Sequence, residues 1–422
     1  MGHHGCVICR ALASGALGAI LAWALAGGAL AAPGDVYVAD QNGGPASSGA
    51  IFRVDLASGA RTQIAAGGPL QSPAGMTLDR DGKLIVTDDG AAAVFRVDPA
   101  TGAVSHVASG GQLTDPWGVA FGPGGRLFVA DIGFADPAGI VFRINANNGA
   151  KIQYAVGPPL VDPAGIADAR DGSLLVADIN GRSGASDGLV HRVDAQRRGV
   201  VATVASGPPL VDPWGIAQAP GGQVLVSDVA AGGGGLFEID ARSGSIRALA
   251  SGPPFAEPLG LATLPDESIL IADAEAGGGP GALLRSDPAT GQTATVASGA
   301  PFSDPSAVLV EPPLCRGEPA TMVGTAGRDT LRGSRFVDVV SGLAGKDRIR
   351  GFNRNDLLCG GAGRDRINSG NGADAIDGGP GKDRLNGAAG PDTIIGGAGR
   401  DRCNGKGSKD RSRGCERRFA IP

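Results

Sequence analysis

Large aromatic side chains are scarce in this chain: Phe, Trp and Tyr together make up 4% of its 422 residues, whereas glycine occurs 73 times. So few bulky side chains among so many turn formers argue against a helical bundle and favour an all-β fold with short strands. The formal net charge of −5 identifies no partner, but it is unevenly divided. Residues 324–422 carry 19 Lys and Arg against 12 Asp and Glu, and the preceding residues carry 18 against 30. An acidic body therefore precedes a basic tail, which predicts two separately solvated domains.

The sequence also has few long apolar runs, and the one of membrane-spanning length lies near the N-terminus. Residues 11–30 are apolar and uncharged, Arg10 precedes them, and Ala29-Leu30-Ala31 places small side chains around a cleavage point. This pattern predicts a signal peptide over residues 1–31 and a mature, secreted, extracellular chain from Ala32. The alternative is an uncleaved anchor, since the run is nearly long enough to span a bilayer. After cleavage we expect no membrane span.

Cysteine is rare in the mature chain, where Cys315, Cys359, Cys403 and Cys415 remain. An even number of cysteines in an exported chain suggests disulfide bonds. Three pairings are possible, and four free thiols are the alternative. We favour Cys315–Cys359 and Cys403–Cys415, which would staple the two ends of the tail.

The body contains repeats of similar length, each marked by a proline that closes a short phrase. The spacings run from 43 to 50 residues, at Pro73, Pro116, Pro163, Pro213, Pro258 and Pro305. Each full unit offers four short apolar runs separated by Gly, Pro and Asp, which predicts a four-stranded antiparallel meander. Radial stacking of such sheets gives a β-propeller. The first copy, VYVAD, lacks a preceding strand and SAVLVE (306–311) is left over, so we expect this last strand to close a six-bladed ring over residues 32–312.

Two phrases carry a resemblance to a known group: DPWGVAFGPGGRLFVAD (115–131) and DPAGIADARDGSLLVADINGRSG (162–184). They resemble the NHL and gluconolactonase-like six-bladed propellers, over about residues 33–312. The resemblance implies the fold and not an activity, because such propellers host many functions.

The residues that the related enzymes use are not found at matching places. Lactonases of this group hold a metal on the axis with Glu, Asn and Asp, but no Glu or Asn opens an inner strand here. Virginiamycin B lyases use a catalytic histidine, and the mature chain has only His106 and His191, which we expect to be half-exposed and away from the axis. We therefore assign no catalytic and no cofactor-binding residue.

Acidic residues recur at one end of the repeats. An Asp closes the second strand of every unit, at Asp40, Asp88, Asp131, Asp178, Asp228 and Asp273. A second set of acidic residues precedes five of the inner strands, at Asp115, Asp162, Asp212, Glu257 and Asp304. Both sets should surround one mouth of the ring, together with Trp117 and Trp214. Hydrogen bonding of Asp to turn amides is the favoured interpretation. The alternative is a face that binds a cation, a cationic ligand or a basic segment.

Residues 324–413 form ten consecutive nonads with Asp in every sixth place, from Asp329 to Asp410. The eighth place is Leu, Val or Ile in the first eight nonads, and places one and four are mostly Gly. A six-residue turn followed by a three-residue strand predicts a parallel β-roll with the eighth-place side chain in a thin core. Glycine permits the turn, and the carboxylate supplies the hard oxygen that calcium prefers.

This pattern resembles the RTX repeat, GGxGxDxUx, where U is a large aliphatic residue. The resemblance implies that coils two nonads apart share a calcium ion, with Asp347, Asp365, Asp383 and Asp401 on one side and Asp356, Asp374 and Asp392 on the other. The expected metal residues are Asp329, Asp347, Asp365, Asp374, Asp383, Asp392 and Asp401, with Gly361, Gly363, Gly379, Gly381, Gly397 and Gly399.

Several nonads depart from the RTX pattern. GSRFVD and GFNRND lack the fourth-place glycine, which weakens the expectation at Asp338 and Asp356, and Ser369 replaces a first-place glycine. Lys or Arg flanks many of the aspartates, so a roll held by Asp–Arg pairs with little metal is the alternative.

These observations predict a secreted calcium-binding protein. A propeller (32–312) serves as a scaffold for an unknown ligand or protein, and a linker (313–323) joins it to a calcium-binding roll (324–422). The first alternative is a metal-dependent hydrolase, lactonase or lyase acting at the propeller mouth. The second is a basic tail that binds acidic polymers, such as anionic glycans or nucleic acid. We expect no nucleic acid, because neighbouring aspartates can neutralise the arginines.

Overall fold

The computed structural model describes residues 34–133, 139–179, 187–220, 222–230, 233–406 and 410–419. The predicted signal peptide lies outside these residues. The described chain is almost entirely strand and turn, with short 3-10 segments at η1 (Pro45–Ser47) and η3 (Ala276–Gly278). None of its helical segments has the length and apolarity that a membrane span requires.

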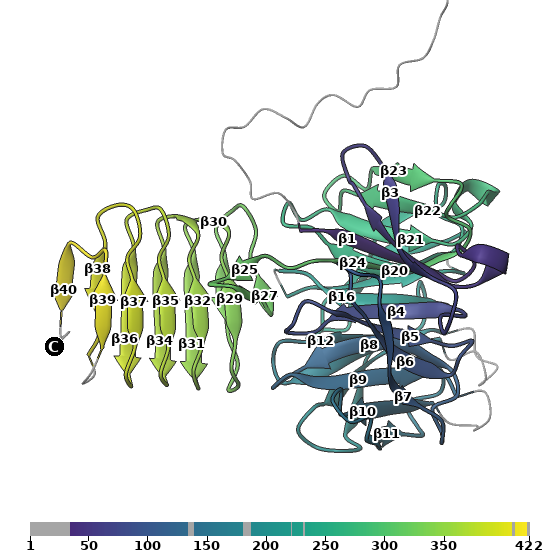
Figure 1. Ribbon diagram of the computed structural model, residues 1–422, viewed down its shortest axis with the longest axis horizontal. Helices are drawn as coiled ribbons and strands as arrows, with labels where there is room; N and C mark the ends of the chain where they lie inside the picture. The colour runs from purple at the N-terminus through teal and green to yellow at the C-terminus, as the bar shows by residue number, and fades with distance from the viewer. Residues whose placement is uncertain are drawn as a thin grey trace, which may run out of the picture. The chain divides into compact units, whose positions relative to one another are not determined.

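Residues 36–310 form six four-stranded antiparallel sheets arranged as the blades of a propeller (Figure 1). The inner strands each begin at one of the repeated prolines: β4 (Pro73–Leu78), β8 (Pro116–Gly122), β12 (Pro163–Asp168), β16 (Pro213–Gln218), β20 (Pro258–Thr263) and β24 (Pro305–Val310). The second strands are β1 (Val36–Asp40), β5 (Leu84–Asp88), β9 (Arg126–Asp131), β13 (Ser173–Asp178), β17 (Val224–Asp228) and β21 (Ile269–Asp273). The third strands are β2 (Ala50–Val54), β6 (Ala93–Val97), β10 (Ile140–Ile144), β14 (Leu189–Asp194), β18 (Gly235–Ile239) and β22 (Ala282–Ser286). The outer strands are β3 (Arg61–Ala66), β7 (Val104–Ser109), β11 (Lys151–Val156), β15 (Val201–Ser206), β19 (Ile246–Ser251) and β23 (Thr293–Ser298).

The ring closes by strand exchange, as the sequence predicts. β24, the last strand of the ring, pairs antiparallel with β1, the first, in the sheet order β24-β1-β2-β3. Apolar residues of adjacent blades fill the spaces between the sheets; Phe52 and Phe302, for example, share one cluster in which both are almost fully buried. Such closure ties the two ends of the propeller sequence into one core and leaves no unpaired inner strand.

In five of the six inner strands a glycine follows the proline by two positions and allows neighbouring inner strands to approach closely. A Cβ at Gly165 would collide with the backbone carbonyl of Trp214 on the next blade, and one at Gly75 would collide with that of Trp117. The equivalent position in the closing strand β24 holds Ala307, whose Cα lies 2.6 Å from where a Cβ of Gly260 would stand. The repeated motifs AGM, WGV, AGI and LGL therefore keep a glycine for steric reasons.

We expect Gly165→Ala to lower the free energy of unfolding by at least about 2 kcal/mol, because the methyl group must displace backbone and not a flexible side chain. Gly279→Ala is the matched control, since a Cβ there would have only the Ala276 carbonyl within 4 Å, at 3.9 Å. Chemical denaturation of both variants checks this prediction. Equal stability of the two would show that the close approach is not required.

Residues 322–419 form a parallel β-roll with two six-stranded sheets (Figure 1). One sheet contains β27 (Met322–Val323), β29 (Val339–Ser341), β32 (Leu357–Cys359), β35 (Ala375–Asp377), β37 (Thr393–Ile395) and β39 (Arg411–Arg413). The other contains β28 (Thr330–Arg332), β31 (Arg348–Asn353), β34 (Arg366–Asn371), β36 (Arg384–Ala389), β38 (Arg402–Asn404) and β40 (Arg417–Phe419). Two smaller pairs are β25 (Leu314–Cys315) with β26 (Glu318–Pro319) and β30 (Ala344–Gly345) with β33 (Ala362–Gly363). Strand neighbours within the nonads are 18 residues apart, for example Ile349 and Ile367, so two nonads make one turn of the roll. The last strand, β40, follows its neighbour β38 by 15 residues.

The core of the roll is the ladder of eighth-place side chains that the sequence predicts. Its buried members are Met322, Leu331, Val340, Ile349, Leu358, Ile367, Ile376, Leu385, Ile394 and Cys403. Disulfides join Cys315 to Cys359 and Cys403 to Cys415, with Cα–Cα distances of 5.7 and 6.0 Å. The favoured pairing is therefore confirmed.

Candidate metal ladders in the roll and the propeller mouth

Alternation along each coil separates the charges of the roll. In the third nonad Asp347 and Ile349 are buried, whereas Lys346, Arg348 and Arg350 are exposed. Places five, seven and nine point outward because side chains of an extended chain alternate between faces. The sixth-place aspartate side chains therefore face the interior of the roll, and the Lys and Arg side chains that flank them face solvent.

The inward aspartates are linked into two ladders by backbone hydrogen bonds at each turn. On one side the N–H groups of Asp329, Asp347, Asp365 and Asp383 donate to Oδ1 of Asp347, Asp365, Asp383 and Asp401, at 2.8–2.9 Å. On the other side those of Asp338, Asp356, Asp374 and Asp392 donate to Oδ1 of Asp356, Asp374, Asp392 and Asp410, at 2.8–3.0 Å. One carboxylate oxygen of each residue is therefore used by the fold itself.

The second oxygen, Oδ2, has no hydrogen-bond partner in seven of these residues. They are Asp347, Asp356, Asp365, Asp374, Asp383, Asp392 and Asp401, and each is no more than 2% exposed. A buried carboxylate oxygen without a partner is costly. Seven repeats of that cost, in register, indicate that the oxygens have a partner other than the protein.

Burial raises the pKa of these carboxyl groups, against the opposing effect of the backbone N–H donor. The pKa rises to about 7 for Asp347, Asp383 and Asp392, to about 8 for Asp356 and to about 6 for Asp365. Neighbouring carboxylates of the same ladder add to the rise at Asp347, Asp356, Asp383 and Asp392. In the metal-free roll these groups therefore hold protons more tightly than in an unfolded chain.

Without calcium, the roll should lose stability as the pH rises. A carboxyl whose pKa is higher in the folded state stabilises the fold below its unfolded value and loses that contribution as pH passes its folded value, here about 6 to 8. We expect the melting temperature of the roll in EDTA to be more than about 5 °C higher at pH 5.5 than at pH 8.5, since one pKa unit is worth about 1.4 kcal/mol. Thermal melts across this range test the prediction, and a melting temperature that rises with pH would contradict it.

The predicted glycines stack coil upon coil. Gly361, Gly379 and Gly397 occupy place two of their nonads, and a Cβ on any of them would collide with the backbone carbonyl of the residue 18 positions earlier. The same is true of the place-four glycines, Gly363, Gly381 and Gly399. Five of these six glycines also have positive φ, between 83° and 144°. At these six positions glycine therefore allows the tight stacking of the turns, which brings carbonyl groups of successive coils close together beside the aspartates.

The departures from the motif change the candidate set. In the first nonad the Thr325 N–H donates to Asp329 Oδ2 at 2.7 Å, and in the second the Ser334 N–H donates to Asp338 Oδ2 at 2.6 Å. Both carboxylates are therefore satisfied within their own turn.

Asp356 behaves differently from what its incomplete motif predicts. Its coil keeps the turn because Phe352 and Arg354 adopt φ values of 81° and 78° in place of glycine. Its Oδ2 is buried and has no hydrogen-bond partner. The first-place glycine gave no signal for this residue, because a Cβ at Gly351 would clash with Asp356 Oδ2 just as one at Gly333 would clash with the satisfied Asp338 Oδ2.

Ser369, the other departure, is fully buried and donates its hydroxyl to the Gly387 carbonyl at 2.7 Å. Among the described residues, no ion pair joins the sixth-place aspartates from Asp329 to Asp401 to a Lys or Arg. The described chain also holds no group of three or more His, Cys, Asp or Glu side chains arranged for a metal. Backbone oxygens would have to complete any site in the ladders.

In the propeller, the strand-end aspartates hold the loops that lead into the inner strands. Asp228 Oδ2 accepts from the N–H groups of Val211 and Asp212 at 2.8 and 3.0 Å, and Asp40 accepts from Ser303 and Asp304 at 2.9 and 3.1 Å. The same pair of bonds recurs at Asp88, Asp131, Asp178 and Asp273. These carboxylates are turned into loop amides, as the favoured interpretation predicts.

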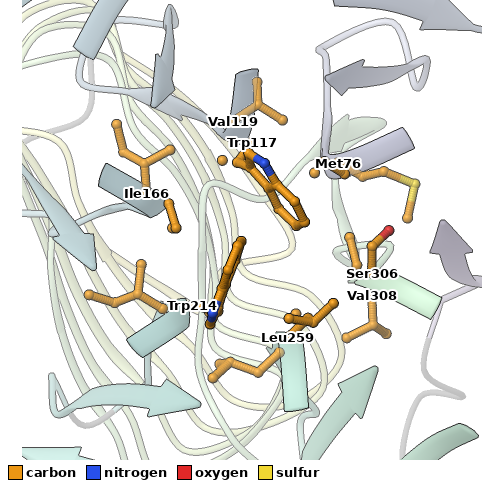
Figure 2. Close-up of a pocket in the computed structure, with 18 residues that line it drawn as sticks. Met76, Trp117, Val119, Ile166, Trp214, Leu259, Ser306 and Val308 are labelled. Atoms are coloured by element: carbon orange, nitrogen blue, oxygen red, sulfur yellow. The ribbon is translucent and has the colours of Figure 1, made fainter. Parts of the chain in front are cut away.

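Two tryptophans meet in the central channel (Figure 2). The second residue of each inner strand is Ala74, Trp117, Ala164, Trp214, Leu259 or Ser306 in turn. Because Ala164 separates the two tryptophans, their rings converge with centroids 4.4 Å apart in an edge contact. The fourth residue of each inner strand also lines the channel; these residues are Met76, Val119, Ile166, Ile216, Leu261 and Val308. Apart from Ser306, whose hydroxyl donates to the Pro73 carbonyl at 2.6 Å, the side chains that line the channel are apolar, and two half-buried indoles lie inside it.

Carboxylates border the indoles. The Trp117 Nε1–H donates to Asp115 Oδ1 at 3.2 Å. Burial, and then the neighbouring carboxylates, raise the pKa of Glu257 and of Asp304. Burial likewise raises the pKa of Asp212. The mouth thus combines aromatic surface with concentrated negative charge.

The histidines lie on outer parts of the blades, but one expectation about them is wrong. His106 is exposed on β7, where its Nε2 lies 2.8 Å from Ser109 Oγ. His191 is not half-exposed: it is fully buried on β14, with Nε2 3.4 Å from Asp178 Oδ2. It replaces the Phe of the VFRVD phrase and occupies the same interior position, which its polarity concealed.

Comparison with known proteins agrees with this architecture. The model of the RTX calcium-binding nonapeptide repeat matches residues 323–351, 350–385 and 377–411, and that of a "Repeat of unknown function (DUF6923)" matches residues 5–158. No curated protein matches the chain. Similar solved structures include the nidogen/laminin complex, at 14% identity over 66% of this chain and 98% of that chain, with a TM-score of 0.52. Virginiamycin B lyase from Staphylococcus aureus has 16% identity over 59% of this chain and 77% of its own, with a TM-score of 0.44.

The tail therefore carries RTX repeats and the body is a six-bladed propeller, so both predicted folds are confirmed. At these identities the likeness to solved structures shows the fold alone. The gluconolactonase-like part of the expected resemblance stays a prediction.

Proposed function

We propose that this chain is an exported calcium-binding protein whose roll takes up calcium along its two aspartate ladders. The observation that carries the proposal is the set of seven buried Oδ2 atoms without a hydrogen-bond partner. Calcium takes six to eight oxygen ligands and removes the repulsion between stacked carboxylates. The RTX match supports calcium as the metal.

The residues fit such an ion on both sides of the roll. Asp347, Asp365, Asp383 and Asp401 would bind it on one side, and Asp356, Asp374 and Asp392 on the other. Carbonyl groups of the turns at Gly361, Gly363, Gly379, Gly381, Gly397 and Gly399 would supply neutral oxygens. Asp329 is the weakest of the predicted ligands, because Thr325 already satisfies its Oδ2.

Calorimetric titration of residues 32–422 with calcium tests the proposal. We expect the wild type to bind several ions, Asp365→Asn/Asp383→Asn to lose part of that stoichiometry, and Asp329→Asn to keep it. Asp329→Asn is the control, because it makes the same chemical change at the same place of a nonad. In the native chain, Oδ2 of Asp329 already accepts a hydrogen bond from the Thr325 N–H. Absence of calcium binding by the wild type would overturn the proposal.

Export is the second element of the proposal. The apolar N-terminal run, the disulfides and the calcium ladders all suit an oxidising, calcium-rich exterior. A roll of mutually repelling carboxylates would fold after export, when calcium becomes available. Mass spectrometry of the secreted protein should find an N-terminus at Ala32; retention of residues 1–31 in a membrane fraction would contradict this.

We assign the propeller, residues 32–312, a role as a binding scaffold joined by residues 313–323 to the roll, residues 324–422. Trp117, Trp214 and the adjoining carboxylates suit a cationic group, which aromatic faces and negative charge both attract. The mature chain holds no other tryptophan, so its fluorescence reports on this mouth. Tetramethylammonium should shift that emission, and a Glu257→Gln/Asp304→Asn variant should weaken the shift; no change in the wild type would argue against a cationic ligand.

A further inference from the structure

The strongest charge pattern on the roll belongs to one of its two sheets. In the first, third, fifth, seventh and ninth nonads, place five is always Lys or Arg, at Arg328, Lys346, Arg364, Lys382 and Arg400. Place seven is Arg in all but the first of these nonads, at Arg348, Arg366, Arg384 and Arg402. Place nine is Arg in the first and third nonads, at Arg332 and Arg350. With Arg417 of β40, these residues form what we call the arginine face, and all of them are exposed.

The strand register stacks these cations into straight rows. Arg348, Arg366, Arg384, Arg402 and Arg417 are direct partners on β31, β34, β36, β38 and β40. Neighbouring strands lie about 4.8 Å apart, so the row repeats a guanidinium at that interval along the roll. Like charges placed directly opposite each other destabilise a sheet, so the row works against the stability of the fold that bears it.

The other sheet shows that the nonad fold does not require these cations. In the second, fourth, sixth and eighth nonads, places five, seven and nine hold no Lys or Arg. The tenth nonad, at the end of the same sheet, is the exception, with Arg411 and Arg413 in places seven and nine. Equivalent row positions on β29, β32, β35 and β37 are Val339, Leu357, Ala375 and Thr393. Since the same backbone is built without Lys or Arg at these places in four successive coils of the other sheet, the arginine face calls for a cause outside the fold.

Internal neutralisation is not that cause. The alternation along each coil turns the sixth-place aspartates inward and the arginines outward. In the described part of the roll, no salt bridge connects a member of the arginine face to an acidic side chain. The prediction that neighbouring aspartates neutralise the arginines therefore does not hold for these residues.

We propose that the arginine face binds a linear anionic polysaccharide, laid along the axis of the roll. Guanidinium groups in a straight row match a polymer that carries carboxylate or sulfate groups at regular intervals. A second row, Asn368, Asn386 and Asn404, runs beside it, and the Asn386 amide donates to Asn368 Oδ1 at 2.5 Å. Amide groups suit sugar hydroxyls.

Two features favour a glycan over a nucleic acid. Places five, seven and nine of these nonads hold no aromatic residue, whereas single-stranded nucleic acids are bound largely by stacking on aromatic side chains. The two disulfides also indicate an oxidising compartment. Anionic polymers met there are chiefly those of cell surfaces and extracellular matrices.

The test uses residues 32–422 in calcium with three polymers of one backbone: dextran, carboxymethyl dextran and dextran sulfate. We expect binding to one or both charged polymers and none to dextran, with affinity falling steeply between about 50 and 200 mM salt. Arg366→Gln/Arg384→Gln/Arg402→Gln should weaken binding at least tenfold and reduce the salt slope by about three. Arg335→Gln/Arg411→Gln/Arg413→Gln removes equal charge from the other nonads and should bind like the wild type. Binding to carboxymethyl dextran but not dextran sulfate, or the reverse, identifies the anionic group.

Three outcomes would overturn the proposal: no binding to either charged polymer at low salt, equal loss in both triple variants, or tighter binding of duplex DNA with the same dependence on the arginine face. The shift of the melting temperature on adding calcium must be the same in both variants as in the wild type. This comparison separates a failure of the glycan proposal from a failure of calcium binding, because the substituted side chains point away from the ladders.

Discussion

In excess EDTA, the roll of the mature chain is expected to melt more than about 10 °C below its value in millimolar calcium. A single site at 100 times its Kd stabilises the folded state by about 2.7 kcal/mol. For a segment of roughly 100 residues, each kcal/mol shifts the melting temperature by about 4–8 °C. Calcium would also remove the cost of seven buried, unpartnered carboxylate oxygens. Differential scanning calorimetry across a calcium titration measures the shift.

The propeller supplies the internal control for this melt. Its strand-end aspartates are satisfied by loop amides, so its own transition should stay fixed as calcium is added. A calcium-dependent shift of both transitions would show that the propeller mouth also holds metal, and the alternative of a metal-dependent enzyme would gain. If neither transition moves, the ladders are structural and the calcium proposal is wrong.

Asp365→Asn is expected to change stability in opposite directions with and without calcium. Asparagine keeps Oδ1 as an acceptor for the Asp347 N–H, a bond of 2.9 Å in the native chain. In EDTA the neutral amide removes a buried charge and should raise the stability of the roll by about 1–3 kcal/mol. In calcium the same change removes a ligand and should lower it by a similar amount. Thermal melts in the two buffers give both values.

Asp329→Asn is the control for this reversal, because Thr325 satisfies its carboxylate through the backbone N–H and the hydroxyl. Its effect should have the same sign in both buffers, since a local hydrogen bond is lost regardless of calcium. A destabilising Asp365→Asn in EDTA would show that Oδ2 already has a protein or solvent partner.

Repetition explains how much of the fold could be predicted. The same residue pattern recurs in each blade and in each nonad. The first repeat lacks an inner strand and the last leaves one over, which predicted that β24 pairs with β1 and closes the ring. The aliphatic residues in place eight predicted the core of the roll. The disulfide pairing was favoured among three because Cys403 and Cys415 close the last turns of the repeat, while Cys315 precedes the repeat and Cys359 lies inside it; the structure contains this pairing.

Breaks in the repeats were harder to interpret. Asp356 was doubted because its turn lacks the fourth-place glycine, but stacking against neighbouring coils holds Phe352 and Arg354 at positive φ, a tertiary effect that one nonad does not reveal. Asp329 keeps the first-place and fourth-place glycines of the motif, yet Thr325, in the second place, donates its N–H to the carboxylate. His191 was misplaced because it takes the interior position of a phenylalanine. The contact between Trp117 and Trp214 depends on ring geometry, which spacing along the chain does not specify.

A crystal structure of residues 32–422 grown in calcium, with anomalous differences collected, tests the central claim most directly. We expect anomalous peaks about 2.3–2.6 Å from Oδ2 of Asp365 and Asp383 and from turn carbonyls, repeated along both ladders. Ladders without such peaks, with Oδ2 bound instead by water or by a guanidinium group, would contradict it.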